Sequence, residues 1–246
     1  MQRPSRSEKK QIKRERIKQK YADEKAQKRA RRTKPSEPLV NPDFLSCRSE
    51  RTRMDREDFI LMSERNPTIL IDCDFQDFME PREQTSLTQQ ILQCYGIVRK
   101  LSRPPRLSLC GVSDKQTSLL SQLPGISRWH FRCTSDALGE IPLTPDYIYL
   151  SADAQEDLDL ASITSKTSII VGGLVDRNRY KGLTHEKARD LGIRTARLPI
   201  SDFVEMSASK VLTVNQVVEI VAEALHDGEW GKVLRRVIPG RKVNLA

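Results

Sequence analysis

The stretch SIIVGGLVDRNRYKG, residues 168–182, gathers side chains that could do chemistry at a single turn of the chain. An apolar run ends in two glycines and one acid, Asp176, which is followed directly by Arg177, Asn178, Arg179, Tyr180 and Lys181. Glycines let backbone or a ligand approach closely, and a carboxylate at that point could accept a proton or a hydrogen bond. A purely structural interpretation stays open beside this one: tight strand packing, with Asp176 in a surface salt bridge to Arg177 or Arg179.

A carboxylate at the end of an apolar run needs a buried strand to hold it, and the chain offers several such runs. They are residues 68–75, 106–112, 129–134, 147–150, 168–175 and 193–200. Helical patterns lie between them, and buried strands that alternate with helices predict an α/β fold, a parallel sheet covered by helices on both faces. Ligands bind at the carboxyl ends of strands in such sheets, which selects the loops after 147–150, 168–175 and 193–200.

Capping patterns predict where the helices begin. Helix starts are expected at Ser86 (with Gln89), Ser113 (with Gln116), Thr184 and Thr213 (with Gln216). The first of these helices has an apolar face formed by Leu87, Ile91, Cys94, Val98 and Leu101. Gly192 is expected to end the third helix, and the valine-rich stripe of the fourth is typical of core packing.

The positive charge of the chain is concentrated at its amino terminus. The formal net charge over 246 residues is +9, yet residues 1–34 alone hold 15 Lys/Arg against 4 Asp/Glu. We expect residues 1–45 to form a basic arm and linker, disordered or transiently helical, and residues 46–66 to connect it to the folded domain. Such an arm suits a polyanion, with affinity that falls as salt rises; a solubilising tail or a nuclear-import signal is the alternative.

The sequence lacks the signatures of several classes of protein. GxGxxG does not follow the first strand, and neither GxxxxGK[ST] nor GxSxG occurs. The histidines are scattered and the five cysteines form no CxxC pair, so neither a metal site nor a disulfide framework is expected. No apolar run approaches the ~18 residues of a membrane span, and the amino terminus lacks the apolar core of a secretory signal. We therefore expect a protein of the nucleus and cytoplasm, without a membrane segment.

Longer segments carry a resemblance to a known family. They are IIVGGLVDRNRYKGLTHEKARDLGIRTARLPI followed by KVLTVNQVVEIV, with TILIDCDFQDFM, DYIYLSADA (146–154) and WGKVLRRVIPGRK (230–242) in the same order. Together they resemble the tRNA guanine-9 N1-methyltransferase family of the SPOUT superfamily over roughly residues 67–242. The element GG-x-VD-x-NRYK is specific, whereas pieces such as RLPI would be weak alone.

The resemblance implies a SPOUT domain whose carboxyl-terminal part forms a trefoil knot, an exception to the usual rule against threaded connections. S-adenosylmethionine would lie bent in the knot, held mainly by backbone groups of three loops, which explains the missing GxGxxG. Carried over by motif, the cofactor-binding candidates are Leu150, Gly172, Asp176, Arg177, Asn178, Arg179, Tyr180, Thr184, Leu198, Lys210, Val211 and Leu212. The amino terminus of the helix after KVLTVNQ would point its N–H groups toward this loop. The resemblance also implies that the protein acts as a monomer.

The implied reaction transfers a methyl group from S-adenosylmethionine to N1 of guanine at position nine of tRNA. Guanine N1 carries a proton and attacks poorly until that proton leaves, so one acceptor near N1 is needed, and Asp176 is the candidate. An ordinary aspartate is a weak base at neutral pH, and burial and flanking arginines act on it in opposite directions. Two roles for Asp176 therefore stay open, general base and hydrogen-bond orienter.

Further cations could grip the RNA backbone. Arg99, Lys100, Arg103 and Arg106 lie near the end of the first long helix and could neutralise phosphates, or they could be a solvated helix end. Three other functions stay open: methylation of adenine N1 at the same tRNA position, a noncatalytic tRNA-binding subunit of an RNA-processing complex, and an unrelated α/β nucleotide-binding protein. The retained Asp176 and NRYK count against the noncatalytic subunit.

Overall fold

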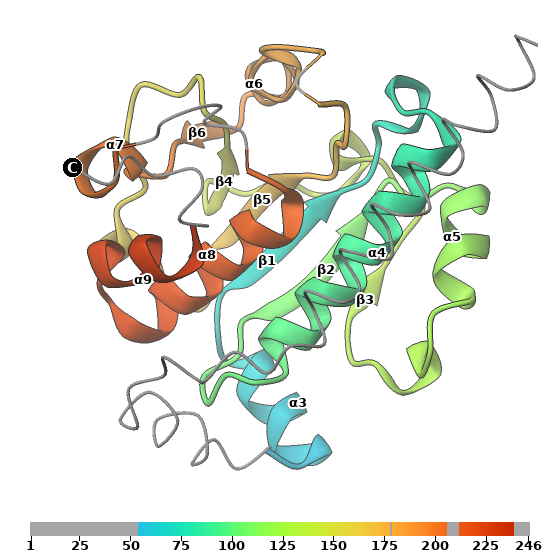
Figure 1. The fold of residues 1–246 in the computed structure, drawn as a ribbon, viewed down its shortest axis with the longest axis horizontal. Helices are drawn as coiled ribbons and strands as arrows, with labels where there is room; N and C mark the ends of the chain where they lie inside the picture. Colours follow the sequence, from blue (N-terminus) through green and yellow to red (C-terminus); the bar gives the residue numbers. More distant parts are fainter. Residues whose placement is uncertain (1–53, 178, 206–211, 239–246) are drawn as a thin grey trace, which may run out of the picture. The chain divides into compact units, whose positions relative to one another are not determined.

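A parallel sheet forms the centre of the fold (Figure 1). In the computed structural model, which describes residues 54–177, 179–205 and 212–238, six strands are ordered β3-β2-β1-β5-β4-β6 and each neighbouring pair is parallel. The strands are β1 (Thr68–Asp72), β2 (Arg106–Cys110), β3 (Arg132–Cys133), β4 (Tyr147–Leu150), β5 (Ser168–Gly172) and β6 (Arg194–Ala196). The predicted parallel α/β fold is confirmed.

Helices cover both faces of the sheet. They are α3 (Arg56–Glu64), α4 (Pro81–Val98), α5 (Asp114–Ser121), α6 (Leu183–Asp190), α7 (Ile200–Phe203), α8 (Val214–Asp227) and α9 (Trp230–Val237). Short 3-10 turns are η1 (Gln76–Phe78), η2 (Ile126–Arg128), η3 (Leu138–Glu140) and η4 (Leu160–Ser162). α4 and α8 lie side by side across one face (Figure 1). Ala188 of α6 and Leu138 of η3 pack with Leu70, Tyr149 and Ile170 on the opposite face.

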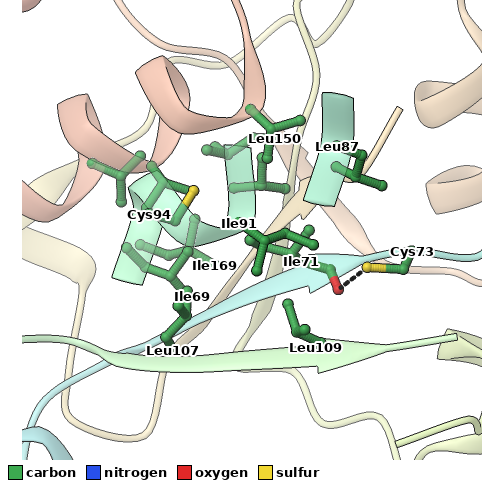
Figure 2. Packing of buried hydrophobic residues seen from close by; sticks show 14 of the residues in the cluster. Ile69, Ile71, Cys73, Leu87, Ile91, Cys94, Leu107, Leu109, Leu150 and Ile169 are labelled. Atoms are coloured by element: carbon green, nitrogen blue, oxygen red, sulfur yellow. Dashed lines mark hydrogen bonds between the residues drawn. The ribbon is translucent and has the colours of Figure 1, made fainter. Parts of the chain in front are cut away.

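The main core lies between α4, α8 and the strands. Figure 2 shows α4 side chains beside those of β1, β2 and β5: Leu87, Ile91, Cys94, Ile69, Ile71, Leu107, Leu109 and Ile169. Each of these is 2% exposed or less, and burying a side chain of this kind contributes about 1.5–3 kcal/mol. The apolar face predicted for α4 is confirmed. The stripe predicted for α8 is confirmed as core at Val214, Val218 and Val221, whereas Val217 and Leu225 are only partly buried.

The buried cysteines are structural thiols. Cys73, Cys94 and Cys110 are free and buried, and the thiol of Cys73 donates to the carbonyl of Ile71 over 3.7 Å (Figure 2). Burial raises the pKa of Cys110 to about 12, and it raises the pKa values of Cys73 and Cys94 as well. These thiols therefore stay protonated at neutral pH, which disfavours nucleophilic or metal-binding roles.

Two of the expected helix starts are wrong. α4 begins at Pro81, and Glu80 and Glu83 form its capping box; Ser86 lies inside the helix, because the apolar pattern that marked it begins only in the second turn. α6 is preceded by Gly182 in a left-handed conformation with φ 77°, so Thr184 lies within its first turn. The starts at Ser113 and Thr213 and the stop at Gly192 are confirmed.

The strand expected at residues 129–134 is also shorter than predicted. Within this range only Arg132 and Cys133 pair with β2, and both residues are exposed. An edge strand with two exposed side chains buries too little apolar surface to extend further. The neighbouring Trp129 instead stacks on Tyr95 of α4, with ring centroids 4.3 Å apart.

Helix α3 lies in the segment that the sequence suggested was a connection. Phe59 of α3 is 2% exposed, and its ring meets that of Tyr95 of α4 edge-on at 6.2 Å. Glu64, at the end of α3, forms an ion pair with Arg106 of β2 at 2.5 Å. The helix and the sheet belong to one unit, Arg51–Ala246.

Several predictions fall on residues outside the described ranges. These are the arm and linker at 1–45 and three candidates for cofactor binding, Asn178, Lys210 and Val211. The trefoil knot stays a prediction, because residues 206–211 between α7 and α8 also lie outside. Among the helices that the structure describes, none has the length and apolar character needed to cross a membrane.

Candidate active site

The carboxyl ends of the middle strands meet at one edge of the sheet. Asp72, the last residue of β1, is in register with Gly172, the last residue of β5. Leu150, at the end of β4, is in register with Val171 on one side and Ala196 of β6 on the other. The three neighbouring strands β4, β5 and β6 therefore end at one edge, as predicted, but β6 ends at Ala196, before the end of the predicted run 193–200.

The sheet has a topological switch point between the adjacent strands β1 and β5. The chain leaves β1 toward α4 on one face, whereas it leaves β5 toward α6 on the other face. In parallel sheets, ligands bind at the carboxyl ends of two adjacent strands whose connections diverge in this way. The loop that carries Asp176 borders this position.

Asp176 is buried within its own loop. The residue is only 7% exposed, and Oδ2 of its side chain accepts a hydrogen bond from the backbone N–H of Tyr180 at 2.8 Å. The structural interpretation is therefore wrong in placing the Asp176 carboxylate on the surface. Arg177 has a φ of 54°, a left-handed conformation that costs a non-glycine residue free energy and clusters at functional sites. The loop is bent sharply directly after the carboxylate.

The two glycines serve internal packing first. A Cβ on Gly172 would come 2.7 Å from Cγ2 of Thr184, and one on Gly173 would come 2.7 Å from the backbone oxygen of Asp72. That same oxygen accepts the N–H of Gly173 at 2.7 Å. The glycines let the loop start tightly against β1 and let Thr184 of α6 approach β5.

Contacts to the β1–α4 segment hold the middle of the Asp176 loop. The N–H of Val175 lies 3.3 Å from the sulfur of Met79, and the ring of Tyr180 meets that of Phe78 edge-on at 5.2 Å. Arg179 donates to both carboxylate oxygens of Glu83, at 3.0 and 2.7 Å. The pKa of Glu83 is lowered by the backbone N–H of Glu80 and then by Arg179, so this ion pair is fully charged at neutral pH.

A buried carboxylate network, which the sequence motifs did not reveal, lies below the loop. Asp72 is 0% exposed, and its carboxylate is 2.9 Å from both the hydroxyl of Tyr149 and Nζ of Lys187. Lys187 of α6 also reaches Asp74 at 3.1 Å and lies 4.5 Å from the ring centroid of Phe75. Burial, with Asp72 beside it, raises the pKa of the Tyr149 hydroxyl. The only signal in the sequence was an acid at the end of the run TILID.

Three of the remaining described cofactor candidates, Leu150, Thr184 and Leu198, lie around the same edge. Leu150 is buried at the end of β4, Thr184 lies against Gly172, and Leu198 follows β6. Leu198 and Leu212 are partly buried and pack against the cluster formed by α7, α8 and α9. Arg177, Arg179 and Tyr180 are exposed, and the side chains of Arg179 and Tyr180 contact the β1–α4 segment.

The amino terminus of α8 has fewer available N–H groups than expected. The N–H of Val214 donates to Gln90 of α4 at 2.9 Å, and that of Thr213 donates to the side chain of Gln216 at 3.1 Å. The side chain of Thr213 in turn accepts the N–H of Gln216. A ligand anion at this helix end would have to displace these bonds, so the expectation of an anion site there has little support.

The four candidate RNA contacts fall into two pairs. Arg99 donates to the carbonyl of Met54 at 3.2 Å, and its guanidinium lies 4.2 Å from the ring centroid of Phe59. Arg106 is paired with Glu64. Lys100 and Arg103 are exposed. Arg99 and Arg106 thus hold α3 in place, and Lys100 and Arg103 are the better candidates for phosphate contacts.

The described ranges, 54–177, 179–205 and 212–238, contain no cluster of three or more His, Cys, Asp or Glu side chains able to hold a metal ion. The nearest grouping of acids at this edge, Asp72 with Asp74, already holds the Lys187 ammonium.

The chain matches a family model described as tRNA (guanine(9)-N(1))-methyltransferase TRM10/TRM10A over residues 2–243. It belongs to this family. The chain is 35% identical over 176 residues to the tRNA methyltransferase 10 homolog A of Xenopus tropicalis, and the matched region covers 71% of this chain and 52% of that protein. The tRNA (guanine(9)-N1)-methyltransferase of Schizosaccharomyces pombe is 34% identical over 179 residues, covering 71% and 58%. The chain thus spans about half the length of the curated relatives it matches.

Solved structures of the TRM10 family share the fold. The crystal structure of full-length spTrm10 with SAH superposes with a TM-score of 0.64 at 31% identity, covering 70% of this chain and 95% of that one. The dual specific Trm10 from Thermococcus kodakaraensis is 18% identical with a TM-score of 0.54, covering 70% and 99%; that likeness concerns the fold alone. The TRM10 family belongs to the SPOUT superfamily, as the resemblance implied.

Proposed function

We propose that this protein transfers a methyl group from S-adenosylmethionine to N1 of guanine at position nine of tRNA. Membership of the TRM10 family supports the reaction class. One structural observation carries the proposal: Asp176, a buried carboxylate, lies in the loop that leaves β5 at the switch point of the sheet. Removal of the N1 proton needs a carboxylate at the position where parallel sheets bind their ligands.

The chain's own residues would handle the proton. Asp176 accepts the hydrogen on N1 as the N1–methyl bond forms and the methyl–sulfur bond breaks, which leaves 1-methylguanine, S-adenosylhomocysteine and a protonated carboxyl group that releases its proton to solvent. The N–H of Tyr180, 2.8 Å from Oδ2, fixes the direction of the carboxylate. Arg177 and Lys181 flank it and are exposed; they would contact RNA phosphates and so position the substrate.

The edge of the sheet fits a cofactor of this kind. Leu174 and Leu198 are only partly buried, so apolar surface remains at the ends of β5 and β6 for an adenine ring. Loop backbone after β4, β5 and β6 lies around the same point and can bond polar atoms of a ligand. When bound, S-adenosylmethionine supplies a methyl group already activated by its sulfonium. A cofactor complex of a TRM10 family structure, spTrm10 with SAH, supports this assignment.

The reaction is tested by incubating the protein and S-adenosylmethionine with unmodified tRNA transcripts, followed by nucleoside mass spectrometry. Two matched transcripts, with guanine or adenine at position nine, separate the guanine and adenine reactions. We expect 1-methylguanosine from the first transcript and no methylated nucleoside from the second. If the protein binds labelled S-adenosylmethionine and tRNA but methylates neither transcript, the noncatalytic tRNA-binding function replaces the proposal.

Removal of the basic arm should weaken tRNA binding. Deleting residues 1–34 removes 15 Lys/Arg and 4 Asp/Glu, and fewer neutralised phosphates mean that fewer counterions are released on binding. We expect a lower affinity and a shallower plot of log affinity against log salt for the truncated protein. Equal slopes for the two proteins would show that the arm does not contact the RNA.

Lys100 and Arg103 should contribute to RNA binding more than their charged neighbours. Replacing both by alanine should lower tRNA affinity uniformly across tRNAs and reduce the salt slope by about 1 per lost phosphate contact. Folding stability should be unchanged, because both side chains are exposed. The matched control is Arg99→Ala, which removes a charge from the same helix end and should instead lower the melting temperature by releasing Phe59 and Met54. An unaltered salt slope in the double variant would exclude phosphate contacts.

A further inference from the structure

Glu83 lies far from Asp176 in the sequence but contacts its loop. Its carboxylate accepts hydrogen bonds from both terminal nitrogens of Arg179, a residue 96 positions away. Arg179 also donates to the carbonyl of Phe78 at 3.3 Å. A guanidinium that is bonded to a side chain through two parallel contacts and to a backbone oxygen has its direction fixed, because the planar fork allows few arrangements.

The Glu83–Arg179 pair acts on a loop that is already under strain. Arg177, between the buried carboxylate and Arg179, has a φ of 54°, which a non-glycine residue keeps only where surrounding contacts enforce it. At the start of the loop, the N–H of Gly173 donates to the backbone oxygen of Asp72. Beyond its far end, the ammonium of Lys187 in α6 forms an ion pair with the carboxylate of Asp72. The Glu83–Arg179 pair is a charged contact that holds the middle.

We propose that Glu83 is a positioning residue for methyl transfer: through Arg179 it holds the described residues of the Asp176 loop, 174–177 and 179–181, in the conformation that aims the Asp176 carboxylate. The inference rests on the proposed function and extends it to a residue on a different element, α4. The Glu83 side chain is 12% exposed and that of Arg179 is 40% exposed. An ion pair this close to the surface adds little to folding stability, so its expected effect is on the geometry of the loop.

The chain offers a substitution that isolates this role. Glu83 also accepts the N–H of Glu80 at 2.9 Å, as part of the capping box of α4. Glutamine fills the same place in a capping box, so Glu83→Gln keeps the helix start and removes the charge that pairs with Arg179. The matched control is Glu80→Gln, because Glu80 is on the same helix turn but is 70% exposed and 3.8 Å from Arg179.

Two readouts test the proposal. Hydrogen exchange followed by mass spectrometry should show faster exchange of the 174–181 peptide in Glu83→Gln than in Glu80→Gln or the wild type. The single-turnover rate of tRNA methylation should fall about tenfold or more, the scale expected for small misplacements of a reacting group. The melting temperature and the affinity for S-adenosylhomocysteine should stay unchanged. Unchanged exchange, or an unchanged rate, would overturn the proposal.

A third comparison shows whether Glu83 acts through Asp176. If it does, adding Glu83→Gln to the Asp176→Asn variant should cause no further loss, since the carboxylate being aimed is already gone. Losses that multiply would mean that Glu83 affects the reaction by another route, and would overturn the assignment. If the wild-type protein itself fails to methylate tRNA, the proposed function fails, and the exchange measurement alone still decides whether Glu83 holds the loop.

Discussion

Asp176→Asn should abolish most of the methylation activity while leaving the fold intact. Asparagine can still accept the N–H of Tyr180 through its side-chain oxygen, so the loop keeps its internal bond. It cannot take the N1 proton, and the loss of an acid–base group lowers rates by roughly 10² or more. We expect a fall of that size in single-turnover methylation of tRNA, measured with enzyme in excess.

The controls for this variant separate chemistry from binding. Affinity for S-adenosylmethionine and the melting temperature should equal those of the wild type. The general-base role predicts that the residual rate of Asp176→Asn rises with pH, because hydroxide then removes the N1 proton in place of the carboxylate. If Asp176 only orients the base, solvent removes the N1 proton in both proteins, and the wild-type rate should rise with pH as steeply as the rate of the variant. Full activity in the variant would remove Asp176 from the chemistry.

The largest effect on stability is expected at Lys187. Its ammonium contacts Asp72, which is 0% exposed, as well as Asp74. Replacing the lysine by methionine keeps most of the side-chain volume and leaves the Asp72 carboxylate buried without its cation. Removing one partner of a buried pair typically costs about 3–5 kcal/mol. The hydroxyl of Tyr149 still bonds Asp72, so we expect the low end of that range, about 3 kcal/mol, in urea unfolding.

Two further variants test the cause of that loss. Lys181→Met makes the same change at an exposed lysine of the same loop region, and exposed substitutions usually alter stability by less than about 0.5 kcal/mol. Adding Asp72→Asn to Lys187→Met removes the stranded charge and should recover part of the stability. If the double variant is less stable than Lys187→Met alone, the ion pair is not the reason for the loss.

The sequence predicted the sheet well because its strands are buried on both faces. Runs such as SIIVGG and TILID are apolar without alternation, which is the pattern of a parallel sheet under helices. Helix starts were less predictable. The start of α4 depends on Pro81 and on two glutamates, whereas the Ser86–Gln89 pattern that fits a capping box lies one turn inside the helix.

The site was predictable only as far as it is contiguous in the sequence. Asp176, the two glycines and the arginines stand in one stretch, and the resemblance to a family marked that stretch. Glu83 and Lys187 could not be found in this way, because their partners, Arg179 and Asp72, are 96 and 115 positions away. Pairings of this kind follow from the order of the strands and from which face each connection takes, and single-sequence patterns do not specify them.

The role of Asp176 is tested most directly by a structure of the protein with S-adenosylhomocysteine and a tRNA that carries guanine at position nine. We predict that the base is turned out of the tRNA stack and that an Asp176 carboxylate oxygen lies about 3 Å from its N1, within hydrogen-bond reach. The nucleotide should lie at the carboxyl ends of β1 and β5. A complex in which Asp176 points away from the base, with another group beside N1, would contradict this prediction.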